Sequence, residues 1–304
     1  MKNIFVCPIC HGKLVELGCA ACNISFQKSN GVPSFICREM YSSQEAYADA
    51  LRIIDFWGNG WGKRLSEPDH KTFFECDQDT LIRYAKNNFE THKASDSIMA
   101  EIPKESFNNK VALNIGCGAG GEAMLLTYNG ANCIAMDITS PAARAAEYLI
   151  HKIGGDGIGI QADSRFIHLE NSSVDLVYSS GVLHHSPEIE KSIAEIHRVL
   201  KPGGKAYIML YATWSVLFIQ QRLMLSMGEG EWETGGRKNP CTTTYSKREC
   251  RSMFSQFNKV KVRKTGESLR HIAKIGRYMP ASLDRFLYPY LGPRLNIVAE
   301  KPAC

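Results

Sequence analysis

The amino-acid sequence predicts an α/β protein built around a mostly parallel sheet. A glycine-rich turn, residues 116–121, follows directly on the apolar run Val111–Ile115, and an isolated acid, Asp137, ends the next apolar run. Three further strand-like runs alternate with helix-like segments downstream. Such alternation is typical of parallel sheets, which bind ligands at the carboxyl ends of their strands.

The glycine turn has the spacing Gly-x-Gly-x-Gly, with Gly116, Gly118 and Gly120 between a predicted strand and a predicted helix. Glycines let the backbone approach a nucleoside cofactor, and an acid about 20 residues further on accepts hydrogen bonds from its ribose. Asp137 lies at that separation. A turn that binds a nicotinamide dinucleotide has the same layout, so this motif alone leaves that alternative open.

Three later runs, 157–163, 174–180 and 205–211, read as the third, fourth and fifth strands. A helix is predicted before the last of them, with Ser186 as its N-cap and Pro187 at its first position. Its apolar stripe has helical spacing and consists of Ile189, Ile193, Ile196 and Leu200. Lys201-Pro-Gly-Gly204 is expected to end it, and Ser246 and Glu249 form a capping box for the next helix.

Together, Leu-Asn-Ile-Gly-Cys-Gly-Ala-Gly, Met-Asp-Ile, Gln-Ala-Asp, Val-Asp-Leu-Val-Tyr-Ser-Ser-Gly-Val-Leu-His-His and His-Arg-Val-Leu-Lys-Pro-Gly-Gly resemble the class I S-adenosylmethionine (SAM) methyltransferases. The branch with the ubiquinone- and menaquinone-biosynthesis enzymes is the most similar. The likeness is strong over 109–211 and loose over 246–301. It implies a Rossmann-like sheet of seven strands, one of them antiparallel, and argues against a dehydrogenase.

The resemblance also implies a SAM site. The three glycines would surround the amino-acid end of SAM, Asp137 would bind the ribose and Asp163 the adenine amino group, and Ser179 would offer backbone contacts near the sulfonium. The residues expected to bind the cofactor are Asn114, Gly116, Gly118, Gly120, Asp137, Ile138, Asp163, Ser164 and Ser179. Asn114 departs from the family, which usually has an acid there to help hold the ammonium group of SAM.

The N-terminus carries two Cys-x-x-Cys pairs separated by eight residues, Cys7 with Cys10 and Cys19 with Cys22. Four thiolates at this spacing predict a closed tetrahedral zinc site with a structural rather than a catalytic role. A redox disulfide pair is the main alternative. The segment resembles the small zinc-ribbon protein that partners several RNA and protein methyltransferases, and a similar ribbon precedes some rRNA methyltransferases.

The expected organisation is a zinc ribbon at 1–36, a helical segment or lid at 37–108 and the methyltransferase domain at 109–304. Trp57 and Trp61, interleaved with glycines, suggest a mobile aromatic loop over the cofactor, although packing in the core is an equal alternative. An insertion at about 212–245 contains the apolar stretch Trp214–Met227, which could be an acceptor lid, a core helix, a dimer interface or a membrane contact.

Composition is that of an ordinary globular protein: 304 residues, 44% hydrophobic and 22% charged. The eleven cysteines and the lack of a secretory signal or a long apolar run favour a cytoplasmic protein without a transmembrane segment. Charge is uneven, because residues 205–304 hold 17 basic and 7 acidic side chains. This basic part could face an anionic acceptor or form a solvated surface. Oligomeric state is left open.

Methyl transfer from a sulfonium is an in-line displacement that depends mainly on positioning. A hydroxyl or carbon-acid acceptor also needs a general base, and His185 is the first candidate, with His184 and Tyr211 next. A small-molecule acceptor (a sugar, a lipid-linked intermediate or a natural product) is favoured over RNA. The fourth strand ends in Ser-Ser-Gly-Val and lacks the Asn/Asp-Pro-Pro-Tyr/Phe sequence that grips a base amine.

Overall fold

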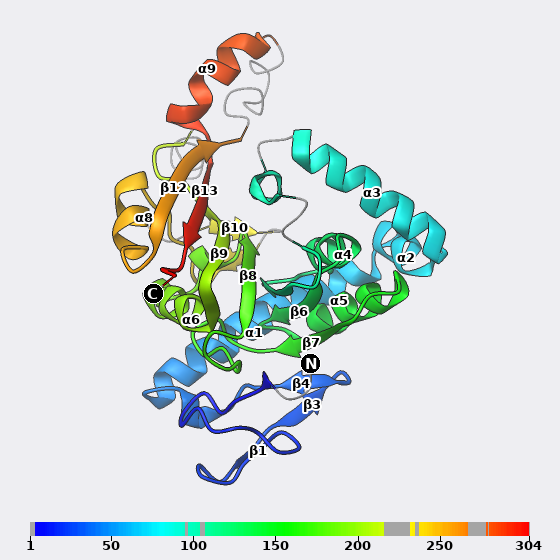
Figure 1. Ribbon diagram of the computed structural model, residues 1–304, viewed down its shortest axis with the longest axis vertical. Coiled ribbons are helices and arrows are strands. Elements are labelled where there is room, and N and C mark those ends of the chain that lie inside the picture. Colours follow the sequence, from blue (N-terminus) through cyan, green and yellow to red (C-terminus); the bar gives the residue numbers. More distant parts are fainter. Residues whose placement is uncertain are drawn as a thin grey trace.

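A computed structural model describes residues 4–94, 97–103, 107–215, 232–234, 237–266, 278 and 280–303 of the chain. Its core is a nine-stranded sheet with the order β12-β13-β9-β8-β5-β6-β7-β4-β3 (Figure 1). The bounds of these strands in chain order are β3 Gln27–Ser29, β4 Val32–Ser34, β5 Val111–Ile115, β6 Asn132–Asp137, β7 Gly157–Gln161, β8 Val174–Ser180, β9 Leu200–Tyr211, β12 Asn258–Thr265 and β13 Arg294–Glu300.

Seven of these strands form the predicted Rossmann-like sheet. The strands β7, β6, β5, β8 and β9 are parallel neighbours, and β13 runs antiparallel to both β9 and β12. The fold class expected from the sequence is thereby confirmed. One boundary was wrong: β9 starts at Leu200, so Lys201-Pro-Gly-Gly204 lies within the strand, where a register shift against β8 accommodates it.

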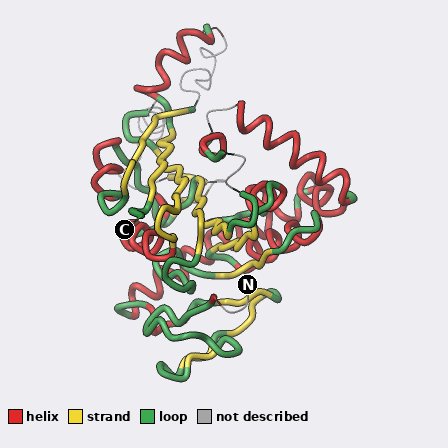
Figure 2. The backbone as a smooth tube through the Cα atoms, in the orientation of Figure 1, coloured by secondary structure: helices red, strands yellow, loops and turns green. Residues whose placement is uncertain are grey.

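Helices cover both faces of the sheet (Figure 2). Buried residues of each strand alternate between the two faces, so that Leu113 belongs to one apolar cluster and Ala112 to the other. The first cluster includes residues of α6 and α8, and the second includes residues of α3, α4 and α5. The helix bounds are α1 Gln44–Ser66, α2 Pro68–Glu75, α3 Gln78–Ala94, α4 Gly121–Tyr128, α5 Ser140–Lys152, α6 Ile189–Val199, α8 Lys247–Met253 and α9 Ala281–Leu291.

Two predicted helix starts had different outcomes. The capping box of α8 is confirmed, because the Ser246 hydroxyl accepts the Glu249 N–H and the Glu249 carboxylate accepts the Ser246 N–H. The predicted N-cap of α6 was wrong: Glu188 is the N-cap, and no side chain caps the helix. Leu183–His185 instead forms a short 3₁₀ turn, and the Ser186 hydroxyl lies 3.4 Å from that of Ser192.

The N-terminal ribbon joins the main sheet. Its first hairpin is β1 (Gly18–Cys19) with β2 (Ile24–Ser25), and its second, β3 with β4, extends the sheet beyond β7 through the pair Ser34 and Gln161. The Phe35 ring stacks on His168 with centroids 4.3 Å apart. The ribbon therefore shares its core with the sheet, which is how a segment this small acquires enough apolar contacts.

The segment with Trp57 and Trp61 is helical, so the predicted aromatic loop was wrong. Gly58, Gly60 and Gly62 all lie inside α1, which starts at the N-cap Ser43, whose hydroxyl accepts the Ala46 N–H. Burial of apolar side chains four or so residues apart outweighs the roughly 1 kcal/mol that each internal glycine costs a helix. Of these side chains, Ile53 and Phe56 are buried, and Trp57 and Trp61 are half-buried where they line the cavity.

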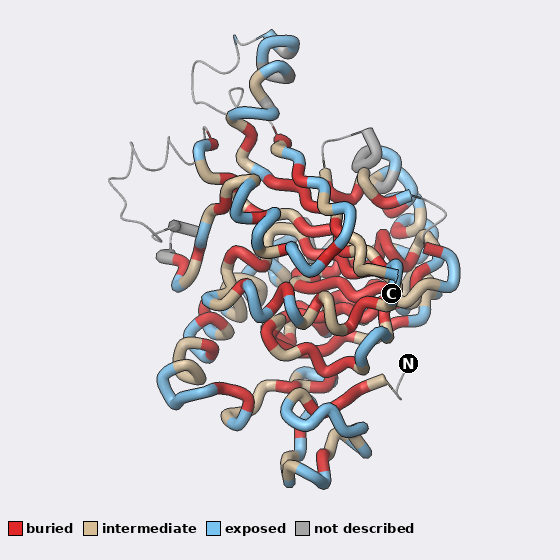
Figure 3. The backbone as a smooth tube through the Cα atoms, turned by 60° about the vertical axis from the view of Figure 1, so that its left-hand side comes forward, coloured by how far each residue is buried: buried red, intermediate tan, exposed pale blue. Residues whose placement is uncertain are grey.

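The predicted apolar stretch Trp214–Met227 belongs to the insertion at about 212–245. Only its first two residues, Trp214 and Ser215, are among the described residues. The described remainder contains the hairpin of β10 (Trp232–Thr234) and β11 (Arg237–Asn239). Figure 3 shows buried residues concentrated in the sheet, while α9 is largely exposed. No helix in the described ranges is long and apolar enough to cross a membrane.

Gly120 provides a test of the packing between α4 and α5. Its φ is +90°, and an added Cβ would lie 2.6 Å from the Ala146 Cα, whereas a Cβ on Gly121 would meet nothing within 4 Å. Gly120→Ala should lower the free energy of unfolding by roughly 2 kcal/mol or more, from backbone strain and overpacking. Urea denaturation measures this. The control Gly121→Ala should be neutral or stabilising, and equal losses in both variants would contradict the packing described.

Candidate functional site

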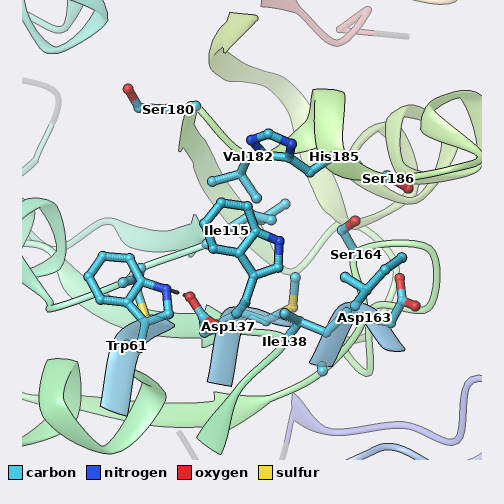
Figure 4. Close-up of a pocket in the computed structure, with 18 of the residues that line it drawn as sticks. Trp61, Ile115, Asp137, Ile138, Asp163, Ser164, Ser180, Val182, His185 and Ser186 are labelled. Carbon is cyan, nitrogen blue, oxygen red and sulfur yellow. Dashed lines mark hydrogen bonds between the residues drawn. The ribbon is translucent and has the colours of Figure 1, made fainter. Parts of the chain in front are cut away.

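A cavity of about 430 Å³ opens at the carboxyl ends of β5, β6, β7 and β8 (Figure 4). The glycine turn, residues 116–121, forms one wall, and the side chains of α1 form another. The loops after β6, β7 and β8 complete it with Asp137, Asp163 and His185. In the close-up, Trp61 and Asp163 lie at opposite sides, with Asp137 and Ile138 between them. This is the sheet edge at which the sequence predicts a nucleoside cofactor.

Asp137 connects the ends of two strands. One carboxylate oxygen accepts the Gly118 N–H at 3.0 Å, and the other accepts the N–H and the hydroxyl of Thr139, both at 2.9 Å. Burial raises the pKa of Asp137, and these hydrogen bonds oppose that shift. The carboxylate therefore fixes the glycine turn after β5 against the loop after β6.

Asp163 is held in a buried ion pair with Arg165. The Arg165 Nη2 lies 2.6 Å from the Asp163 Oδ2, and both side chains are less than 5% exposed. The Tyr41 hydroxyl donates to the same oxygen at 3.2 Å, and Arg165 also contacts Glu188 at 3.1 Å. Tyr41, which follows the ribbon, and Arg165 thus orient the acid expected at the adenine. The adjacent Ser164 hydroxyl lies 2.8 Å from that of Ser192.

Helix α1 sends a row of side chains to the cavity: Ile53, Trp57, Trp61 and Arg64. Trp61 lies directly against the glycine turn, because a Cβ on Gly118, whose φ is +51°, would be 2.6 Å from the Trp61 Cζ2. The Trp57 ring lies 5.0 Å from the His185 ring, and the Arg64 guanidinium lies 5.3 Å from the Trp61 ring centroid. The two tryptophans therefore line the cavity.

His185 meets the cavity from the turn after β8. Its Nδ1 lies 3.0 Å from the Cys241 carbonyl and from the Thr242 hydroxyl, and 3.1 Å from the Asn239 amide nitrogen. The Cys241 carbonyl can only accept and the Asn239 amide nitrogen can only donate, so Nδ1 has a partner in either tautomer of the neutral ring. Burial lowers the pKa of His185 to about 4. The ring is therefore neutral near pH 7.

His184 and Tyr211 do not line the cavity. Their rings stack with centroids 3.8 Å apart, and the His184 ring lies 4.2 Å from that of His185. His184 is fully buried, and neither of its ring nitrogens has a hydrogen-bond partner among the described residues. Burial holds the pKa of His184 well below its usual range. His184 is thus a neutral packing element behind His185.

Seven of the predicted site residues line one cavity: Gly116, Gly118, Asp137, Ile138, Asp163, Ser164 and His185. Asn114, Gly120 and Ser179 lie outside its lining, although all three belong to the adjoining strands and turn. Asn114 is buried, and its Nδ2 donates to the Tyr178 carbonyl at 3.4 Å. Sequence reasoning missed Arg64, Glu122 and Arg165; only the helical spacing from Trp57 to Arg64 could have indicated the first.

The four ribbon cysteines converge. The Sγ atoms of Cys7, Cys10, Cys19 and Cys22 all lie within 4.8 Å of one another, with 3.8 Å between Cys7 and Cys22 and 3.4 Å between Cys10 and Cys19. A tetrahedral Zn²⁺ with Zn–S bonds of about 2.3 Å places its sulfurs about 3.8 Å apart. These thiols are not paired as disulfides. The geometry fits a four-thiolate metal site.

The sheet and its cavity define a Rossmann-like protein of the nucleoside-binding class. Residues 113–208 match the family model of a methyltransferase domain. The chain thus contains a class I SAM-dependent methyltransferase domain, the family that the sequence motifs indicate.

Two curated relatives each match only part of this chain. A sterol 24-C-methyltransferase of Pneumocystis carinii is 31% identical over 56% of this chain and 41% of its own length. A malonyl-[acyl-carrier protein] O-methyltransferase of Enterobacter lignolyticus is 28% identical over 40% of this chain and 46% of its own length. The chain thus spans less than half the length of these curated relatives.

Solved structures are similar at lower identity. A SAM-dependent methyltransferase of Methanosarcina mazei is 19% identical, with a TM-score of 0.47 over 64% of this chain and 93% of its own. A chain from the complex between the Haloferax volcanii Trm112 methyltransferase activator and a methyltransferase is 16% identical, with a TM-score of 0.48 over 75% of this chain and 98% of its own. Values this low carry no conclusion about function.

Buried histidines should make the fold sensitive to acid. Burial lowers the pKa of His168 to about 3 and that of His185 to about 4. It also holds the pKa of His184 well below its usual range. The unfolded chain takes up these protons near pH 6.5 and the folded chain does not. Each histidine should therefore lower the free energy of unfolding by about 1.4 kcal/mol per pH unit as the pH falls below 6.5.

The variant His184→Phe isolates one of these protons. Urea denaturation at several values between pH 7.5 and 5 should give a pH slope smaller by one proton than in the unchanged protein. At pH 7.5 the variant should be as stable or more stable, because an aromatic ring replaces one whose buried nitrogens have no partners. An unchanged slope, or a large loss of stability at pH 7.5, would show that His184 is charged or hydrogen-bonded.

Proposed function

We propose that the protein transfers the methyl group of SAM to a small-molecule acceptor. The observation that carries this proposal is one cavity lined by the glycine turn, Asp137, Asp163 and His185. Asp137 and Asp163 suit the ribose and adenine of the cofactor, since both are buried acids at adjacent strand ends. His185 faces the same space from the turn after β8, which lies on the other side of β5 from β6.

The residues would act mainly by positioning. SAM supplies an electrophilic methyl group, and the glycine turn and the acids would fix its direction. In the tautomer whose Nδ1–H donates to the Cys241 carbonyl, His185 Nε2 would accept a hydrogen bond from the O–H or N–H of the methyl acceptor and orient the acceptor's lone pair toward the methyl carbon. With a pKa of about 4, His185 is a weak base, so proton transfer would accompany methyl transfer rather than precede it. Trp57 and Trp61 would exclude water.

The relatives support a small or carrier-bound acceptor. Their names refer to a sterol and to malonyl-[acyl-carrier protein], and neither refers to a nucleic acid. The apolar side chains of α1 in the cavity suit an acceptor with an apolar part. RNA remains the alternative on the strength of the basic residues 205–304.

Incubation with methyl-tritiated SAM and fractionated cell extract tests the proposal. The label should enter a fraction that passes a size filter or an organic-extractable fraction, and RNase treatment should leave the yield unchanged. Label that is lost on RNase treatment, together with activity that falls steeply with salt, would establish the RNA alternative. Absence of SAM binding would reject both.

His185→Ala should lower turnover by about 10²-fold because the acceptor loses its hydrogen-bonding partner. SAM affinity, measured by calorimetry, should change little. The matched control is His151→Ala on the exposed side of α5, outside the cavity, which should leave turnover unchanged. Equal turnover in the His185 and His151 variants would remove His185 from the reaction.

We also propose that the ribbon binds one structural Zn²⁺ through Cys7, Cys10, Cys19 and Cys22. All four ligand positions are filled by thiolates, which leaves no open position for chemistry. The metal would stabilise a segment that contacts the cofactor edge, because the Ser29 hydroxyl and the Asn30 amide both lie 2.8 Å from the Ser140 hydroxyl on α5.

Elemental analysis of the purified protein should give about one zinc per chain, because the four thiolates form one closed site. Cys7→Ser should reduce this value strongly. Cys76→Ser is the control, because Cys76 lies outside the cluster and a serine hydroxyl can also donate to the Phe73 carbonyl. A metal-free native protein, or a disulfide between the ribbon cysteines, would reject the zinc site.

A further inference from the structure

The two ends of the cavity differ in charge. Asp163 lies at one end and is engaged by Arg165, and Asp137, which accepts the Gly118 N–H, lies between the ends. The cavity is also lined by Arg64, Glu67 and Glu122. Arg64 belongs to the Trp61 end because its guanidinium lies 5.3 Å from the Trp61 ring, and Trp61 lies against the glycine turn. Figure 4 shows this end opposite Asp163.

Given the proposed cofactor, the ligand also has two unlike ends. Adenosine is neutral, whereas the amino-acid end carries an ammonium and a carboxylate. A zwitterion requires an acid and a base to replace its water, since charges that lose hydration need charged or hydrogen-bonding partners. The acids at Asp137 and Asp163 suit the ribose and adenine, so the amino-acid end belongs beside the glycine turn.

Asn114 cannot supply the acid. It is a neutral side chain, it is 1% exposed, and it does not line the cavity. Glu122 has the required charge and place. It follows the glycine turn directly, in the first turn of α4, is half-buried and lines the cavity.

The charge of Glu122 helps to raise the pKa of the Tyr178 hydroxyl, after the main cause, which is burial. A helix N-terminus favours an acid at the position of Glu122.

We propose that Glu122 binds the ammonium of the cofactor and Arg64 binds its carboxylate, so that the negative charge absent at Asn114 is supplied one element later. Arg64 is exposed at the mouth of the cavity, and no carboxylate among the described residues lies within ion-pair distance of it. Its guanidinium presents a planar fork that suits a carboxylate. This inference rests on the proposed function.

Calorimetry with ligands that lack one group at a time tests the assignment. Compared with S-adenosylhomocysteine, 5′-methylthioadenosine lacks the whole amino-acid end. Decarboxylated SAM lacks only the carboxylate of SAM. Glu122→Gln should weaken the binding of S-adenosylhomocysteine, SAM and decarboxylated SAM by about tenfold or more, because each ligand loses a charge-assisted contact to its ammonium. The same variant should bind 5′-methylthioadenosine with unchanged affinity, which also shows that its fold is intact.

Arg64→Ala should weaken the binding of SAM by a similar factor but should not change the affinity for decarboxylated SAM. The controls are Lys63→Ala, an exposed neighbour on α1 outside the cavity, and Glu67→Gln, the other acid of the lining. Both should bind all four ligands as the unchanged protein does. A loss in Glu67→Gln but not in Glu122→Gln, or equal losses for ligands with and without the amino-acid end, would overturn the assignment. If the unchanged protein binds none of the ligands, the proposed function itself fails.

Discussion

One buried carboxylate, that of Asp137, holds the functional edge of this protein together. It accepts hydrogen bonds from Gly118 after β5 and from Thr139 after β6, so the loops that follow two neighbouring strands share one anion. Burial raises the pKa of Asp137, and these hydrogen bonds oppose that shift because they stabilise the charged carboxylate. The glycine turn can accept this arrangement because Gly118 has a positive φ and leaves room for Trp61.

The five parallel strands of the core could be predicted because each carries its own local pattern, a short apolar run bounded by glycines or acids. The two further strands, β12 and β13, were implied only by the family resemblance. The two acids, the glycines and His185 could be placed for the same reason: each ends a strand, and strand ends meet at one edge. The fusion of the ribbon to β7 could not be foreseen, because the pairing of Ser34 with Gln161 depends on contacts between distant segments.

The aromatic segment shows where local patterns mislead. Gly58, Gly60 and Gly62 indicate a loop by propensity, yet the helix forms because Ile53 and Phe56 are buried and the half-buried Trp57 packs against His185. His184 shows the opposite failure. Both adjacent histidines after the strand are candidates in sequence, with His185 first. The 3₁₀ turn at Leu183–His185 directs His185 into the cavity and His184 into the core. Tertiary packing decides both cases.

The central claim is that this edge binds the adenosine cofactor of a methyltransferase. Calorimetric titration with S-adenosylhomocysteine, compared side by side with NAD, tests it most directly. The geometry predicts one site per chain for S-adenosylhomocysteine and no binding of NAD. In Asp137→Ala the binding of S-adenosylhomocysteine should be weaker by about tenfold or more, because charge-assisted contacts to the ribose are lost. Binding of NAD in place of S-adenosylhomocysteine, or affinity unaffected by the loss of the Asp137 carboxylate, would contradict it.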